Sequence, residues 1–374
     1  MNKSTQPKSL KLKTYKRFSE VIPSSTKLMC IGVHKLQDYM TCNRLYFWKW
    51  VLNLMSRRLN LPFLFGSIVH TGFELVAAKK QFGYICKAMH KTSIDEAKGF
   101  ILNREATDEK AIQFQIALLL IKTYRKLFKN ELDNFETLGT EISFVKRLEL
   151  CPVDLLGTID AYGKENKKLK LKELKTAARV NNEYFLRLTF AKQINAYAVG
   201  IKELTGKYPT GCTYFVIRKP GIRVKLKESQ AQFLKRLEED LLSRPDFYFI
   251  RQNISFGING IRAVLSDVEW ATLDLYNKYE LLDEEQLVDP FCWARNDDAC
   301  FNYGVCKYFT LCRNGSQFKL FLQLYTMRNI RYKLEVQELS DKFSVNTKPR
   351  SKMKGTYYDD SGQADEQTQE EEEN

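Results

Sequence analysis

Long apolar runs are missing from this sequence of 374 residues. No run reaches the roughly 20 apolar residues that a membrane-spanning helix needs. The lysine-rich beginning, residues 1–16, also lacks the apolar stretch of a secretory signal. We therefore expect a cytoplasmic protein with no membrane partner, in a compartment where disulfides are disfavoured.

A phosphate-binding loop is also missing. The segment Leu204-Thr-Gly-Lys207 resembles one faintly, but Ile201 stands where the first glycine is needed and Tyr208 replaces the Ser or Thr. The segment also ends a predicted helix instead of opening one. These differences argue against a nucleotide-driven motor in this chain.

The charge is unevenly distributed. The chain carries +14 overall, but residues 351–374 hold two lysines against eight acidic residues and are therefore at −6, which leaves +20 on the first 350 residues. A body this basic suits a polyanionic partner such as nucleic acid. A lysine-rich solvated surface is the simpler alternative, so charge alone favours nucleic acid only modestly.

Periodicity predicts an α/β protein with helices before and after a small mixed sheet. Helical patterns cover residues 34–55, 65–80, 112–128, 184–204, 229–242 and 266–282. Strand patterns cover residues 141–145, 155–162, 169–176, 211–217, 221–226 and 247–250. The chain then divides into a flexible basic arm (1–28), a helical region (29–135), a sheet-containing core (136–285), a cysteine-rich segment with a closing helix (286–336) and a disordered acidic tail (337–374).

Two carboxylates are predicted to meet on a hairpin. Strand alternation places Glu173 and Lys175 on one face. If the turn is centred near Asn166 and Lys167, Asp160 lies directly across from Glu173, with Cβ atoms about 5 Å apart. Two carboxylates this close repel each other unless a cation lies between them, and oxygen ligands suit Mg²⁺ or Mn²⁺. In a chain this charged, however, such a motif also arises by chance.

Neighbouring motifs strengthen that interpretation. Gln193 and Tyr197 share a face of the following helix. His70 lies on an earlier helix, one turn after Gly66, which permits close backbone approach. Glu74 is a weaker candidate of the same kind, and the sequence gives no role for the other two histidines.

Nine cysteines are present, and three of them are evenly spaced at Cys300, Cys306 and Cys312. Steps of six scatter side chains around a helix, and Asn302-Tyr-Gly304 is a turn signal. Evenly spaced thiols on irregular backbone favour metal ligation. Cys42 and Cys292 compete as the fourth ligand, whereas four others read as packing residues: Cys30, Cys86, Cys151 and Cys212.

In this order the motifs resemble RecB-like nucleases of the PD-(D/E)XK superfamily, over roughly residues 24–313. The motifs that carry the resemblance are Gly66-x3-His70, Gly157-x2-Asp160, Glu173-x-Lys175 and Gln193-x3-Tyr197. The iron–sulfur subgroup, which includes AddB and the CRISPR-associated RecB-like exonucleases, has one cysteine before these motifs and three after them. The resemblance thus implies a 4Fe–4S cluster on Cys42, Cys300, Cys306 and Cys312, with zinc as a chemical alternative.

The resemblance also implies a restriction-endonuclease-like core and the roles of its residues. His70, Asp160, Glu173 and the carbonyl of Leu174 would bind Mg²⁺ or Mn²⁺, and Lys175 would position the attacking water. Gln193 and Tyr197 would orient Lys175 or a phosphate.

The implied activity is that of a DNA exonuclease, acting on ends or single strands in recombination or repair. It would be a stand-alone phage or bacterial enzyme, with a helicase or recombination protein as a partner. The alternatives are a non-catalytic DNA- or partner-binding protein that keeps the fold and, less favoured, an electron-transfer iron–sulfur protein.

Overall fold

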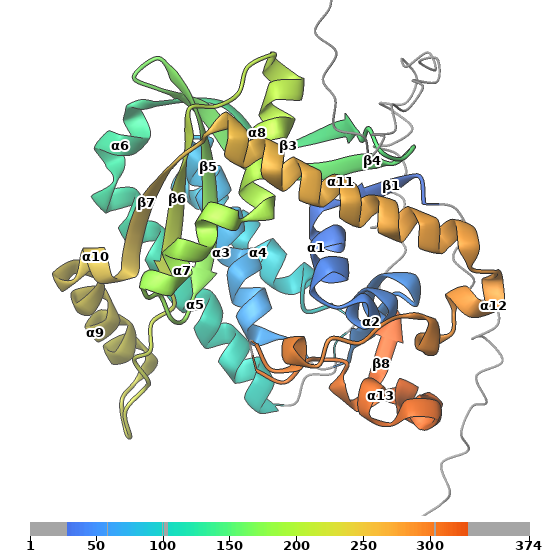
Figure 1. Ribbon diagram of the computed structural model, residues 1–374. Helices are drawn as coiled ribbons and strands as arrows, with labels where there is room; N and C mark the ends of the chain where they lie inside the picture. The colour runs from blue at the N-terminus through green and yellow to red at the C-terminus, as the bar shows by residue number, and fades with distance from the viewer. Residues whose placement is uncertain (1–27, 58, 99, 101–103, 303, 328–374) are drawn as a thin grey trace, which may run out of the picture.

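The computed structural model describes residues 28–327, except residues 58, 99, 101–103 and 303 (Figure 1). The predicted basic arm at 1–28 lies almost entirely outside the described residues, and the predicted acidic tail at 337–374 lies wholly outside them. Within the described part, no helix has both the length and the apolar character needed to cross a bilayer. The predicted divisions after residues 135 and 285 stay predictions.

A mixed sheet of six strands forms the centre of the fold, which confirms the α/β prediction. The strands follow the order β1-β4-β5-β6-β7, and β3 also pairs with β4. Their bounds are β1 Cys30–Gly32, β3 Phe135–Arg147, β4 Asp154–Glu165, β5 Lys168–Ala177, β6 Gly211–Arg218 and β7 Phe249–Ser255. A separate antiparallel pair joins β2 (Leu54–Ser56) to β8 (Tyr325–Met327).

One edge of β4 is shared by two different strands. Because β3 pairs with β4 all the way from Asp154 to Glu165, β1 and β5 must both use the opposite edge. There β1 pairs with residues 154–156 and β5 with residues 161–165. The segment between them, Gly157–Asp160, therefore lies where the two neighbours separate. We call this opening the sheet gap.

The β4–β5 hairpin has the predicted register. Its turn residues Asn166 and Lys167 have φ angles of 50° and 64°, as a two-residue type I′ turn requires. Glu165 pairs with Lys168, and the ladder continues to Ala161 and Lys172. The next residues in this register are Asp160 and Glu173, so these two side chains come from directly opposed positions.

Helices bury both faces of the sheet. Along β6, Cys212, Tyr214 and Val216 belong to one apolar cluster with α8, whereas Phe215 and Ile217 belong to another with α3 and α5. This alternation follows from the period of two of a strand. The helices on the side of Phe215 are α3 Leu61–Ala77, α4 Phe82–Asp95, α5 Arg104–Leu127 and α9 Gln230–Ser243. Those on the side of Tyr214 include α1 Val33–Thr41, α8 Lys192–Thr205 and α11 Ile258–Leu281 (Figure 1).

Shorter helices fill the connections. They are α2 Asn43–Tyr46, α6 Lys129–Asp133, α7 Asn182–Leu186, α10 Pro245–Tyr248, α12 Glu284–Leu287 and α13 Phe309–Arg313. A π-helical segment covers Phe47–Val51, and 3-10 turns cover Arg187–Phe190, Pro290–Cys292, Asp298–Cys300 and Gly315–Leu324.

Three predicted elements differ from the structure. The helix expected over residues 184–204 is divided into α7, the 3-10 turn Arg187–Phe190 and α8. The helix expected over residues 34–55 is interrupted at Cys42, whose backbone is extended, and it continues as α2, the π-helical segment and β2. The strand expected over residues 221–226 does not form, and Leu226 is 93% exposed. Ile222 is the one apolar residue of that segment that packs against the core, whereas Val224 and Leu226 are exposed, so burial does not stabilise a strand there.

Candidate functional site

The sheet gap brings three acidic side chains into one row. Asp160 on β4 and Glu173 on β5 come from opposed positions, as described above. On β3, Thr140 pairs with Ala161 and Ile142 with Ile159, which leaves Glu141 opposite Asp160. The backbone of Glu141 has a φ of 49°, a strained conformation of the kind that collects at functional sites.

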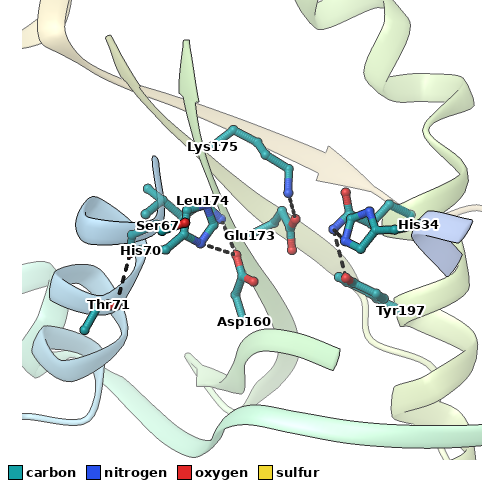
Figure 2. A network of polar contacts seen from close by, with 10 residues as sticks. His34, Ser67, His70, Thr71, Asp160, Glu173, Leu174, Lys175 and Tyr197 are labelled. Carbon is teal, nitrogen blue, oxygen red and sulfur yellow. Dashed lines mark hydrogen bonds and ion pairs between the residues drawn. The ribbon is translucent and has the colours of Figure 1, made fainter. Parts of the chain in front are cut away.

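His70 enters the sheet gap from α3. Its Nδ1 lies 3.7 Å from Oδ2 of Asp160, and that oxygen also accepts a hydrogen bond of 3.0 Å from the backbone N–H of Leu174. One turn earlier, Gly66 permits the close approach that the sequence predicted, because a Cβ there would lie 3.2 Å from Oγ1 of Thr176 on β5. Figure 2 shows the imidazole directed at the Asp160 carboxylate.

Glu173 and Lys175 form an ion pair in the middle of the sheet gap. The Nζ of Lys175 contacts Oε1 of Glu173, which confirms that both side chains project from the same face of β5 (Figure 2). Glu173 is fully buried, and its second oxygen, Oε2, has no hydrogen-bond partner. A buried carboxylate oxygen without a partner is costly, and a bound cation would satisfy it.

The acidic groups of the sheet gap disfavour one another's ionisation. Burial, with Asp160 nearby, raises the pKa of Glu173 to about 8 despite the ion pair with Lys175. Burial and the charges of Asp160 and Glu74 raise the pKa of Glu141 to about 7. The pKa of Glu74, on α3 one turn after His70, is raised by burial and Asp160. A divalent cation would offset this repulsion.

The charge of Lys175 is maintained by its acidic neighbours. Burial lowers the pKa of Lys175, but Glu173 and Asp160 outweigh that effect, so the pKa lies above its ordinary value. The side chain therefore presents a positive charge beside the three carboxylates. This is the arrangement that offsets negative charge on a reacting phosphate.

Gln193 and Tyr197 lie beside the sheet gap, since Glu173 and Asp160 both act on Tyr197. The Nε2 of Gln193 donates a hydrogen bond of 2.8 Å to the hydroxyl oxygen of Tyr197. Tyr197 is nearly fully buried and packs edge-to-face on Phe144. The ring of Phe144 fits because a Cβ on Gly157 would lie 2.5 Å from it. The glycine of the Gly157-x2-Asp160 motif thus makes room for the ring that supports Tyr197.

His34, which the sequence left without a role, also belongs to this site. It lies at the beginning of α1, and its Nε2 is 3.5 Å from Nε2 of Gln193 (Figure 2). Burial, followed by the charges of Lys175 and Lys49, lowers its pKa. Only the rarity of histidine in the chain could have drawn attention to it, because the contact joins residues 159 positions apart.

The segment that contains Cys42 lies against the cysteine-rich segment. The backbone N–H of Arg44 donates to the carbonyl of Ala294 at 2.9 Å, and the hydroxyl of Tyr308 donates to the carbonyl of Leu54 at 2.7 Å. The pairing of β2 with β8 extends this contact. The two ends of the described chain are therefore joined here.

The four predicted cysteines share this neighbourhood. Burial raises the pKa of Cys306, and the nearby thiols of Cys300 and Cys42 add to that effect. Cys312 is influenced in the same way by Cys306 and Cys42. Cys300, Cys306 and Cys312 thus each lie within electrostatic reach of Cys42.

Two of these sulfurs accept hydrogen bonds from N–H groups. The backbone N–H of Asn296 lies 3.4 Å from Sγ of Cys42, and Nε1 of Trp48 lies 3.2 Å from Sγ of Cys312. Metal-bound thiolates receive such hydrogen bonds. The donor set therefore fits a thiolate-bound metal centre chemically.

Neither the predicted ligands of the sheet gap nor the four cysteines are arranged as a complete metal-binding site. Among residues 28–327, with the gaps already given, no group of three or more His, Cys, Asp or Glu side chains is close enough to hold a metal ion. In the sheet gap, Lys175 pairs with Glu173, and the Leu174 N–H pairs with Asp160. Ligation would therefore require side chains of both groups to reorient.

Known proteins resemble this chain at the level of family and fold. A sequence model described as the PD-(D/E)XK nuclease superfamily matches residues 31–313. No curated protein is significantly similar to the chain. Among solved structures, one named "Putative exonuclease", from Eubacterium rectale, is 12% identical with a TM-score of 0.40, over 82% of this chain and 99% of its own. Another, named SSO0001, is 13% identical with a TM-score of 0.28, over 50% of this chain and 83% of its own.

The family match covers most of the chain and includes the whole sheet gap. It begins in β1 and ends in α13, so it takes in His70, Asp160, Glu173 and Lys175 as well as the four cysteines. The chain belongs to the PD-(D/E)XK nuclease superfamily.

Proposed function

We propose that this protein is a Mg²⁺- or Mn²⁺-dependent nuclease of the RecB-like type that hydrolyses phosphodiester bonds in DNA. The observation that carries the proposal is the sheet gap, where His70 contacts Asp160, Lys175 pairs with Glu173, and the buried Oε2 of Glu173 has no hydrogen-bond partner. An oxygen-rich, partly buried site beside a fixed ammonium suits a hard divalent cation and a phosphate.

His70, Asp160 and Glu173 would hold the cation, and the Leu174 carbonyl is a further ligand candidate. When bound, the cation offsets charge on the scissile phosphate and lowers the pKa of water. Lys175 holds its positive charge beside the carboxylates and positions the attacking water. Gln193 and Tyr197 fix one another through their hydrogen bond and orient Lys175 or a phosphate oxygen.

We further propose that the four cysteines hold a structural 4Fe–4S cluster, with zinc as the chemical alternative. Support comes from the shared neighbourhood of Cys42, Cys300, Cys306 and Cys312 and from the N–H hydrogen bonds to two of their sulfurs. Phosphodiester hydrolysis needs no electron transfer, so the role of the centre is to hold the two ends of the domain together. A brown, iron-containing protein after anaerobic purification supports iron–sulfur, and a colourless protein with bound zinc supports zinc.

The biological setting follows from the resemblance and from the basic body of the chain. We propose exonuclease action on DNA ends or single strands during recombination or repair, in the cytoplasm of a bacterium or a phage-infected cell. A helicase or recombination protein would be the partner that supplies such strands.

The activity is tested by incubating end-labelled single- and double-stranded DNA with Mn²⁺ and, separately, with EDTA. We expect cleavage only with the metal and its loss in Asp160→Ala and Lys175→Ala. The competing function is that of a non-catalytic DNA- or partner-binding protein with the same fold. It is favoured if no metal supports cleavage while the wild type and both variants bind DNA equally well.

A further inference from the structure

A strongly basic groove lies where the C-terminal ends of α3 and α5 meet. It is a cavity of about 460 Å³, large enough for a ligand of nucleotide size. We call it the basic groove. Its cationic lining residues are Lys79, Lys80, Lys122, Arg125, Lys126 and Lys129.

The positive charge of the basic groove exceeds what the surrounding structure neutralises. All six cations are exposed. Among the side chains that the structure describes, only Lys122 has an acidic partner, Glu238 at 3.2 Å. The C-terminal ends of α3 and α5 meet here, and each supplies about half a negative charge. Counted over the side chains that the structure describes, two half-charges and one surface ion pair leave roughly four positive charges unbalanced.

The end of α3 keeps a lysine where glycine is usual. Lys79 has a φ of 55°. Its N–H bonds to the carbonyl of Val76 at 3.0 Å, and the N–H of Lys80 bonds to that of Leu75 at 2.9 Å. This is a Schellman ending, whose left-handed position favours glycine. Lys79 therefore keeps a strained backbone conformation at the end of α3. As a result, two successive lysines, Lys79 and Lys80, line the groove.

An aromatic ring accompanies the cations. Phe82, at the beginning of α4, lines the groove beneath the guanidinium of Arg125, 5.8 Å from the ring centre. Tyr84, two residues later, is 58% exposed. Phe82 is half-buried and lines the groove, and Tyr84 lies beside it in the sequence. Basic grooves that also carry aromatic rings are typical of proteins that bind single-stranded nucleic acid.

The groove and the sheet gap lie on different sides of the same helix. Val76 is about 120° around α3 from His70, and Lys79 is roughly 13 Å further along the axis. With a helix diameter of about 10 Å, the two sites are roughly 17 Å apart in a straight line. At a stacked rise of about 3.4 Å per nucleotide, about five nucleotides of a strand span this distance.

We propose that the basic groove binds the phosphate backbone of the nucleic-acid strand at a point about five nucleotides from the scissile bond. This rests on the proposed nuclease function, because that function places the strand at the sheet gap. The groove holds the part of the strand that is not being cleaved. Long strands therefore bind more tightly than short ones, with no change at the reacting phosphate.

The test measures binding of a labelled 20-nucleotide single strand in EDTA, so that no cleavage is needed. The groove variant carries Lys80→Gln, Arg125→Gln and Lys126→Gln. The matched control removes the same charge at three exposed lysines outside the groove: Lys207→Gln, Lys227→Gln and Lys319→Gln. Losing three phosphate contacts reduces the slope of log K against log salt by about 2 and weakens binding roughly tenfold to a hundredfold near 0.1 M salt. We expect the control to change affinity by less than about threefold.

Lys79→Gly provides a second test that does not risk the fold. Glycine suits the left-handed position, so the variant should keep or raise the Tm while it weakens strand binding. With Mn²⁺, the groove variant should raise KM for the 20-nucleotide strand and leave cleavage of a tetranucleotide unchanged.

Three results overturn the proposal: equal affinity of the groove variant and the matched control, an unchanged salt slope, or equally strong competition by a polyglutamate of the same charge. If the salt slope falls as expected but no metal supports cleavage, the groove assignment stands and the nuclease assignment fails.

Discussion

The sheet gap and the cysteine region differ in how far apart their residues lie along the chain. Asp160, Glu173 and Lys175 come from one hairpin, whose turn and ladder place them by local backbone hydrogen bonds. Cys42 meets the cysteine-rich segment across 254 residues, through packing and isolated hydrogen bonds. The comparison teaches that Asp160, Glu173 and Lys175 are positioned locally by one hairpin, whereas the contact between the two ends of the chain depends on the whole fold. Changes in the first region should affect rate, and changes in the second should affect stability first.

The largest expected effect is on the rate of Asp160→Asn. The substitution removes a charged cation ligand but keeps the shape of the side chain, so we expect cleavage to fall about a thousandfold or more. Because the amide oxygen of asparagine can still accept the hydrogen bond from the Leu174 N–H, thermal unfolding should change little. Cleavage of end-labelled DNA measures the loss of rate, and circular dichroism measures the Tm. A large drop in Tm would contradict the idea that Asp160 serves catalysis and not stability.

Cys306→Ala tests the other region. Loss of one of four ligands should release the metal centre and lower the free energy of unfolding by about 4 kcal/mol or more. Cleavage should then fall because the protein unfolds. Cys86→Ala, at a cysteine predicted to serve only packing, is the matched control. A Cys306→Ala protein that stays folded, metal-free and fully active would contradict the proposal that a metal centre on the cysteines stabilises the fold.

Gly157→Ala should give an intermediate effect inside the sheet gap. The new Cβ would lie 2.5 Å from the ring of Phe144, and overpacking of this kind costs about 1–3 kcal/mol. Displacement of Phe144 should also disturb Tyr197 and reduce cleavage. Combining Gly157→Ala with Phe144→Leu should lose less stability than the two single changes added together. If the stability losses of the two single variants simply add in the double variant, Gly157 does not serve to make room for the Phe144 ring.

His34→Ala should have the smallest effect. His34 contacts Gln193 at 3.5 Å and no predicted metal ligand directly, so it acts through positioning. We expect kcat to fall about tenfold or less with Tm and strand binding unchanged, and His34→Asn to recover part of the loss. A fall in Tm that accounts for the lost activity would instead assign His34 a structural role.

The hairpin could be predicted from sequence because its determinants are local. Asn166 and Lys167 adopt the turn, and a period of two then places Glu173 beside Lys175 and across from Asp160. His34 could not be predicted in the same way, because its contact with Gln193 is made only after the sheet and helices assemble. The break at Cys42 was missed for a related reason: its neighbours follow helical spacing, but tertiary contacts with the cysteine-rich segment override that preference.

The most direct test of the central claim is single-turnover cleavage of an end-labelled single strand over a titration of Mn²⁺, for wild type and Glu173→Gln. Glu173 supplies the unpartnered buried oxygen on which the proposed cation site depends. We predict that the wild-type rate rises with Mn²⁺ and saturates, whereas Glu173→Gln shows little cleavage at any concentration although it is folded. Equal rates for the two proteins at every Mn²⁺ concentration, or cleavage that persists in EDTA, would contradict the account.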